Sequence, residues 1–338
     1  MESQLKRPSN RMSVSTSRSS GVIASTGSYR PILPEEITGL PMFVHSITPD
    51  TDPTLTQAGP SCVLVFNSND PSGAGGLAAD VSAIASVGAH ALPVMAGAFA
   101  RDTSRIFDFF AMNDEAVAEQ ARAVLEDVEV RAIKLGFVGT PDNLGVVAGV
   151  SADYPDVPLI AHMPDLSWWT VEQIEAYHDA FSDLILPQTS VLTGNHSTLW
   201  RWLLPGWSGE RSPSARDIAV AAGELGASMT LVTGISTIDG QIENTLAAPH
   251  AILASEKFPR QEQGFAGAGD TLSAALTALL ASGSELPLAF SEAVSYLDRC
   301  LTGGFHPGMG HIVPDRLFWA QPEDAADAPT TTPPAVTP

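Results

Sequence analysis

Hydrophobic positions follow two alternating patterns along the middle of the chain. Short apolar runs predict strands at 62–66, 91–100, 132–138, 158–163, 190–194 and 229–235. In the segments between and after them, apolar residues recur every three or four positions. This spacing predicts helices at 75–88, 114–128, 170–181, 214–226, 269–282 and 287–303. The strand–helix rhythm predicts an α/β fold with a mostly parallel central sheet covered by helices on both faces.

Three segments depart from this rhythm. Residues 241–260 (QIENTLAAPHAILASEKFPR) predict a hairpin or meander. Residues 1–58 are rich in Ser, Thr and Pro and have no convincing apolar face, which favours a disordered or irregular extension over a transit peptide. Residues 321–338 are of low complexity and predict a disordered tail. The folded domain is therefore expected to span residues 59–320.

Composition and charge narrow the classes of partner. The 338 residues include 17 Lys and Arg against 38 Asp and Glu, a formal net charge of −21. Such a chain is a poor match for nucleic acid or an anionic membrane, and a small-molecule partner is favoured. The two cysteines form neither a disulfide framework nor a metal cluster, which favours a reducing cytoplasm. No apolar run reaches transmembrane length.

The first glycine-rich turn, within NSNDPSGAGGLAAD (67–80), contains Gly73-x-Gly75-x-x-Ala78, which resembles a dinucleotide-binding fingerprint. Asp102 lies at a plausible distance to bind a ribose. However, six residues separate the strand end at Phe66 from Gly73, whereas the fingerprint glycine should follow its strand almost directly. The spacing argues against NAD. No Gly-Lys-Ser/Thr follows these turns, so a phosphate-binding P-loop is also excluded.

The second turn opens an apolar helix with Gly267, Ala268, Gly269 and Asp270. Backbone N–H groups at a helix start, together with the helix dipole, form an anion site. An aspartate there has two interpretations. It is either a helix-capping acid, or a general base that accepts a proton from a hydroxyl as that hydroxyl attacks a phosphorus atom. The turn alone leaves both open.

A family resemblance decides between them. The chain resembles the ribokinase-like superfamily, and most closely the hydroxymethylpyrimidine/phosphomethylpyrimidine kinases of thiamine biosynthesis. The similar motifs run in collinear order: NDPSGAGGLAAD (69–80), AIKLGFVG (132–139), LILPQTSVLTGN (184–195), GAGDTLSAAL (267–276) and GFHPGMGHIVPDRLFWA (304–320). The resemblance implies a three-layer α/β/α fold, ATP and Mg²⁺ as cofactors, a small-molecule substrate and a possible homodimer.

The resemblance also implies roles for individual residues. Asp270 would be the general base, and Gly267, Ala268 and Gly269 would form the anion hole. The residues expected to face the pyrimidine are Gly75, Asp80, Phe99, Arg101 and Phe137. The residues expected beside the nucleotide are Asn195, Thr233 and Gly234.

Departures from the family pattern keep two alternatives open. The family usually has Cys where this chain has Asp270, and Gln where it has Arg101. A guanidinium only donates hydrogen bonds, which favours an acceptor-rich or anionic substrate such as a pyridoxal-like ring or another small alcohol. His162 and Thr198 stand where the family has acids that help to order magnesium. The metal ligands are therefore unassigned, and the second alternative is a catalytically impaired binding or regulatory protein.

Overall fold

The computed structural model describes residues 59–320 of the chain. The predicted extension of residues 1–58 and the predicted tail of residues 321–338 lie outside the described residues. No helix within the described range is long and apolar enough to cross a membrane.

A nine-stranded sheet forms the centre of this range, in the order β3-β2-β1-β4-β5-β6-β7-β8-β9. Six neighbouring strands pair in parallel: β2 (His90–Arg101), β1 (Cys62–Asn69), β4 (Val130–Leu135), β5 (Leu159–Met163), β6 (Thr189–Asn195) and β7 (Met229–Ser236). The outer strands are antiparallel to their neighbours: β3 (Ile106–Ala111) at one end, and β8 (Gln241–Ala248) and β9 (Ala251–Pro259) at the other. The mostly parallel α/β fold is confirmed, and so is the hairpin expected at 241–260.

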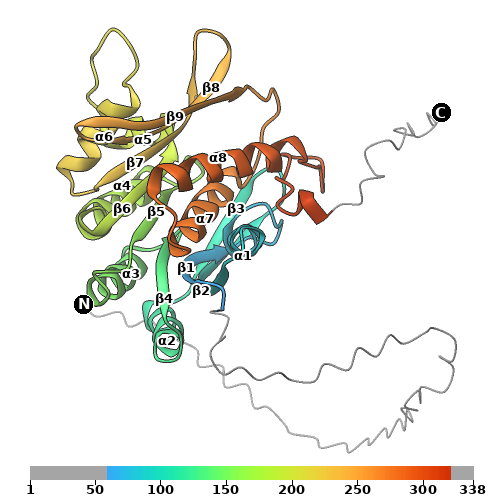
Figure 1. The fold of residues 1–338 in the computed structure, drawn as a ribbon. Coiled ribbons are helices and arrows are strands. Elements are labelled where there is room, and N and C mark those ends of the chain that lie inside the picture. Colours follow the sequence, from blue (N-terminus) through green and yellow to red (C-terminus); the bar gives the residue numbers. More distant parts are fainter. Residues whose placement is uncertain (1–58, 321–338) are drawn as a thin grey trace, which may run out of the picture. The chain divides into compact units, whose positions relative to one another are not determined.

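Helices cover both faces of the sheet (Figure 1). One face packs against α1 (Gly76–Ser86), α7 (Ala268–Ala281) and α8 (Leu286–Thr302). The other packs against α2 (Asp114–Leu125), α3 (Pro141–Asp153), α4 (Val171–Ala180), α5 (His196–Leu203) and α6 (Ala215–Glu224). A π-helical turn, Phe181–Ile185, and a 3-10 turn, Leu186–Gln188, continue α4 towards β6, and a second 3-10 turn spans Phe318–Ala320. The result is the expected three-layer α/β/α arrangement.

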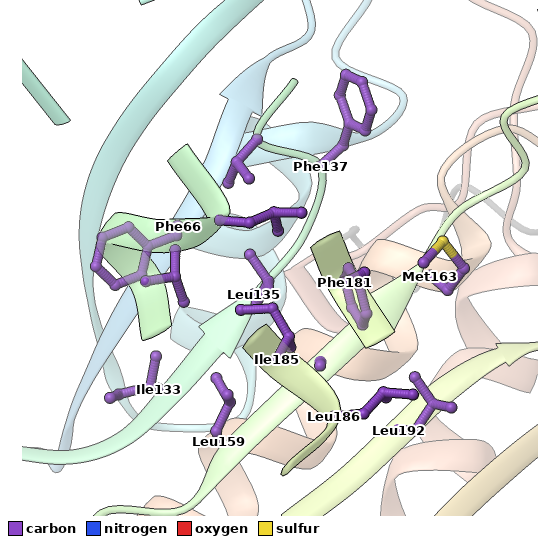
Figure 2. Close-up of a cluster of buried hydrophobic side chains, with 14 of the residues drawn as sticks. Phe66, Ile133, Leu135, Phe137, Leu159, Met163, Phe181, Ile185, Leu186 and Leu192 are labelled. Carbon is purple, nitrogen blue, oxygen red and sulfur yellow. The ribbon is translucent and has the colours of Figure 1, made fainter. Parts of the chain in front are cut away.

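The sheet has a hydrophobic core on each face because successive side chains of a strand point to opposite faces. In β1, Leu64 and Phe66 join the core beneath α2–α6, whereas Val63 and Val65 join the core beneath α1, α7 and α8. Because both faces are covered, consecutive apolar residues face both sides of the sheet, as in the run 63–66 of β1. Figure 2 shows the larger core, where Phe66 gathers with side chains from β4, β5 and the π-helical turn.

Three elements do not appear among the predicted ones, for different reasons. β3 is an edge strand with partly exposed side chains, so its pattern lacks a buried run. α3 contains glycines and valines that weaken helical propensity, but Thr140 caps its first turn and Pro141 is its first residue. α5 begins directly after β6, where the Asn195 side chain caps it. In both helices the capping residue marks a start that hydrophobic spacing misses.

Candidate active site

A cavity of about 450 Å³ lies beyond the carboxyl ends of the parallel strands, where ligands bind in open α/β sheets. The strand ends supply one side of its lining, and the start of α7 supplies another. Ten of the twelve predicted site residues line this cavity: Gly75, Phe99, Arg101, Phe137, Asn195, Thr233, Gly267, Ala268, Gly269 and Asp270. The cavity is therefore open and not filled by side chains of the described residues.

The start of α7 is shaped by Gly267. Its φ of +84° lies in the left-handed region, and a Cβ atom placed on it would lie 1.5 Å from the carbonyl oxygen of Ala74. Within the described range, no side chain caps this helix. The first N–H groups of α7, at Ala268, Gly269 and Asp270, therefore have no helical acceptor and lie at the cavity wall. Such a bare helix start is suited to hold a phosphate group.

Asp270 lies in the first turn of α7 with its carboxylate held from three sides. Oδ1 accepts hydrogen bonds from Lys134 Nζ at 2.8 Å and Asn67 Nδ2 at 3.1 Å, and Oδ2 accepts from the Gly76 N–H at 2.9 Å. Burial alone would raise the pKa of Asp270, but the charge of Lys134 and the hydrogen bonds from Lys134 and the Gly76 N–H hold that pKa well below its usual range. One acceptor position remains on Oδ2. The side chain is 19% exposed, so that position is accessible.

Asp80 does not lie where the resemblance places it. Its carboxylate is fully buried behind the cavity wall, 2.8 Å from Lys134 Nζ and 2.7 Å from Asn67 Nδ2. A direct contact between Asp80 and a substrate is therefore a wrong expectation. Burial raises the pKa of Asp80 to about 6. Lys134, itself fully buried, bridges Asp80 and Asp270. Although it lies in the apolar strand β4, its ammonium is salt-bridged and not exposed at the surface.

One half of the cavity suits a planar acceptor. Phe99 and Phe137 are stacked with ring centroids 5.4 Å apart, and Trp168 meets both rings edge-on. Arg101 lines the same half and pairs with the buried carboxylate of Asp70 at 3.2 Å. Sequence reasoning missed Asp70 and Trp168. Asp70 belongs to a recognised motif, but nothing in the sequence pairs it with Arg101.

The other half continues into an adjoining cavity of about 210 Å³. Asn195 and Thr233 line both cavities, and Gly234 lines only the second. Gly234 has a φ of +73°, and its N–H donates to Asn244 Oδ1 at 3.1 Å. These three residues therefore lie together, as expected for one binding region. The adjoining cavity is lined largely by apolar and amide side chains from β8, β9 and α8.

The substituted acids give an unusual environment for a metal. His162 is buried, and its Nδ1 lies 3.0 Å from the Thr193 hydroxyl. Burial lowers its pKa to about 4, so its imidazole is neutral near pH 7. No cluster of three potential metal-ligating side chains occurs among residues 59–320. Mg²⁺ often needs only one or two carboxylates besides substrate phosphates. The exposed Asp165 carboxylate lines the cavity, 3.6 Å from the Arg201 guanidinium, and keeps oxygen lone pairs for such a metal.

Fold and site together define a small-molecule kinase with an alcohol acceptor. The uncapped start of α7 can hold a phosphate, and the Asp270 carboxylate lies beside it. The cavity lined by aromatic side chains connects to the adjoining cavity. The chain belongs to the phosphomethylpyrimidine kinase family, whose sequence model matches residues 70–315.

Similar proteins agree with this assignment. The hydroxymethylpyrimidine/phosphomethylpyrimidine kinase of Mycobacterium leprae is 28% identical over 270 residues, covering 77% of this chain and 95% of the relative. Its counterpart in Haemophilus influenzae is 25% identical, covering 74% and 94%. Among solved structures, Bacillus subtilis pyridoxal kinase in complex with ADP has a TM-score of 0.70 at 18% identity, covering 77% of this chain and 99% of that one. A phosphomethylpyrimidine kinase from Clostridium difficile has a TM-score of 0.59 at 21% identity, covering 71% and 99%. The structural similarities establish the ribokinase-like fold.

Proposed function

We propose that this protein transfers the γ-phosphoryl group of ATP to hydroxymethylpyrimidine, to its monophosphate, or to both, in thiamine biosynthesis. The observation that carries this proposal is the position of Asp270, whose free Oδ2 acceptor position lies beside the bare start of α7. The curated relatives named for this activity support the choice of acceptor.

In the proposed reaction, the acceptor ring lies against Phe99, Phe137 and Trp168 with its hydroxymethyl group directed at Asp270. The hydroxyl oxygen forms a bond to the γ-phosphorus, the bond from that phosphorus to the bridging oxygen breaks, and ADP leaves. The hydroxyl proton passes to Oδ2 of Asp270. A carboxylate with a lowered pKa is a weak base. It suffices because the transition state is loose, so the hydroxyl becomes strongly acidic only as the new bond forms.

The bare N–H groups at Ala268, Gly269 and Asp270 would hold the transferring phosphoryl group. Lys134 keeps Asp270 ionised through its 2.8 Å contact. ATP would place its base in the adjoining cavity near Gly234 and its phosphates past Asn195 and Thr233. When bound, Mg²⁺ would neutralise charge on the phosphates, and Asp165 would hold it. Cytoplasmic location and a homodimer complete the proposal. Phe107 and Phe110 on edge strand β3, 57% and 63% exposed, support a protein contact.

One observation favours a second acceptor. Arg101 offers only donors to the acceptor half, and an aromatic alcohol with oxygen acceptors on its edge, such as pyridoxal, would match it. The experiment is a ranking of kcat/KM for hydroxymethylpyrimidine, its monophosphate and pyridoxal with Mg-ATP, each product being identified by mass spectrometry. The proposal expects the highest value for one of the two pyrimidines. A higher value for pyridoxal would establish the second candidate, and no transfer to any of the three would refute both.

A further inference from the structure

A buried arginine outside the cavity connects the two glycine-rich turns of the site. Arg316 follows α8 and is only 7% exposed. Its guanidinium donates from Nε to the Thr271 hydroxyl at 2.8 Å, from Nη1 to the Gly73 carbonyl at 3.2 Å, and from Nη2 to the Ala74 carbonyl. Thr271 belongs to the first turns of α7, and Gly73 and Ala74 belong to the turn before α1. One planar group thus holds both turns.

The backbone of Arg316 is itself fixed to α8. The Arg316 carbonyl accepts from the Tyr296 hydroxyl at 2.9 Å, and the preceding residue, Asp315, donates its N–H to the Cys300 carbonyl at 2.9 Å. Tyr296 and Cys300 are both buried. The guanidinium is therefore presented from a packed helix rather than from a free loop.

The two turns that Arg316 holds meet directly beside the atoms that take part in the proposed reaction. Where the turns meet, Gly267 approaches Ala74 so closely that no side chain fits between them. Directly beside this contact, the Gly76 N–H donates to Asp270 Oδ2, the atom with the free acceptor position. Thr271, which accepts from Arg316, also donates to the Gly267 carbonyl at 2.8 Å. A shift between the turns would move Gly76 away from Asp270 and open the wall between acceptor and phosphate.

We propose that Arg316 is a positioning residue that fixes the acceptor turn, residues 73–76, against the start of α7, so that the acceptor hydroxyl rather than water reaches the γ-phosphorus. This inference rests on the proposed kinase function. Lysine would keep the charge of Arg316, but its three donors lie on one nitrogen and not on a planar fork, so they do not match acceptors spread over two turns. Arg316→Lys therefore tests the geometry separately from the charge.

The test compares Arg316→Lys with a matched control, Arg299→Lys. Arg299 is exposed on α8, and its guanidinium lies over the Phe318 ring at 4.2 Å. For Arg316→Lys we expect kcat for transfer to fall about 10- to 100-fold, because a displacement on the scale of 1 Å has such effects. Nucleotide Kd should change by less than about twofold, and the ratio of ADP released to acceptor phosphorylated should rise severalfold. Arg299→Lys should leave all three unchanged. Equal behaviour of the two variants would overturn the proposal.

Two further variants and one exchange measurement separate this inference from the proposed function. Thr271→Val removes the Nε acceptor and should reproduce the rise in uncoupled ADP release, whereas Thr271→Ser keeps the hydroxyl and should restore coupling. Hydrogen exchange of the Gly75 and Gly76 amides should be about tenfold faster in Arg316→Lys than in Arg299→Lys. If the wild type phosphorylates no acceptor, the proposed function fails, but unchanged exchange at Gly75 and Gly76 is what would refute the positioning role.

Discussion

The two glycine-rich turns of the site look alike in sequence but use their backbone amides in opposite ways. In the turn before α1, the Ser72 and Gly75 N–H groups donate to Asp70, and the Gly76 N–H donates to Asp270. In the turn before α7, no side chain of the described residues caps the helix. The first turn is therefore occupied by the protein's own carboxylates, and only the second is available to an external anion.

This difference explains why the fingerprint-like Gly73-x-Gly75 is not a dinucleotide site. A pyrophosphate would have to displace Asp70, which is almost completely buried and also paired with Arg101. A glycine pattern indicates that a backbone can approach closely, but not what it approaches. At Gly75 the close neighbours are the carboxylates of Asp270 and Asp70, and at Gly76 the closest is the backbone carbonyl of Ser68.

The largest expected effect is at the bare turn. In Gly267→Ala, the methyl group would meet the Ala74 carbonyl at 1.5 Å, and the residue would keep a positive φ. We expect the free energy of unfolding to fall by about 3 kcal/mol or more, together with the loss of activity. Gly73→Ala is the matched control in the other turn, because its φ is +70° but nothing lies within 4 Å. It should cost about 1 kcal/mol. Equal losses in denaturant titrations would contradict this account of the contact.

The next effect comes from the lysine between the two carboxylates. Lys134→Met leaves Asp80 and Asp270 close together without their buried cation. Breaking such a cluster should cost about 3–5 kcal/mol in the free energy of unfolding. The double variant Lys134→Met/Asp80→Asn removes one of the charges and should recover part of that loss. A double variant that is less stable than Lys134→Met in urea titrations would refute this view of the cluster.

A smaller effect concerns pH. Burial raises the pKa of Asp80 from 3.8 to about 6, so the folded state binds a proton more tightly than the unfolded state. The resulting contribution to the free energy of unfolding is fully present below pH 3.8 and is lost as pH rises through about 6. It amounts to about 3 kcal/mol. His162 acts in the opposite direction: its pKa is lowered from 6.5 to about 4, so its contribution falls as pH falls through that range.

Comparing Asp80→Asn with the wild type isolates the contribution of Asp80 to the pH dependence of stability, because both proteins contain His162. Between pH 4 and 7, the stability of Asp80→Asn relative to the wild type should rise. A constant difference across this range would show that the pKa of Asp80 is not raised.

The smallest effect separates the roles of the two turns. Asp70→Asn keeps the shape of the side chain but weakens its hold on Gly75 and Arg101. Because only the acceptor half depends on that turn, the KM for the acceptor should rise about tenfold. The Kd of a nonhydrolysable ATP analogue, measured by calorimetry, should stay within about twofold. A larger change for the analogue than for the acceptor would reverse the assignment of the two halves.

The sequence predicts most of the fold because both faces of the sheet are buried, so apolar runs and helical spacing are strong. It misses β3, α3 and α5 because an edge strand and cap-dependent helices carry weak hydrophobic patterns. At the site, ten predicted residues line the cavity because motifs at strand ends converge in this fold. Asp80 was misplaced because a motif gives the order of residues along the chain but not the direction of a side chain. Arg316 was missed because its partners lie more than 40 residues away in sequence.

The most direct test of the central claim compares Asp270→Asn with the wild type. The amide keeps the shape of the side chain but cannot accept the hydroxyl proton as a carboxylate does. The measurement is the rate of ADP release coupled to acceptor phosphorylation, with ATP-analogue binding measured in parallel. We expect the rate to fall by about 10²- to 10⁴-fold while the analogue Kd changes little. A variant that keeps wild-type turnover would show that Asp270 is a structural acid, held by Lys134, Asn67 and Gly76, and not the base.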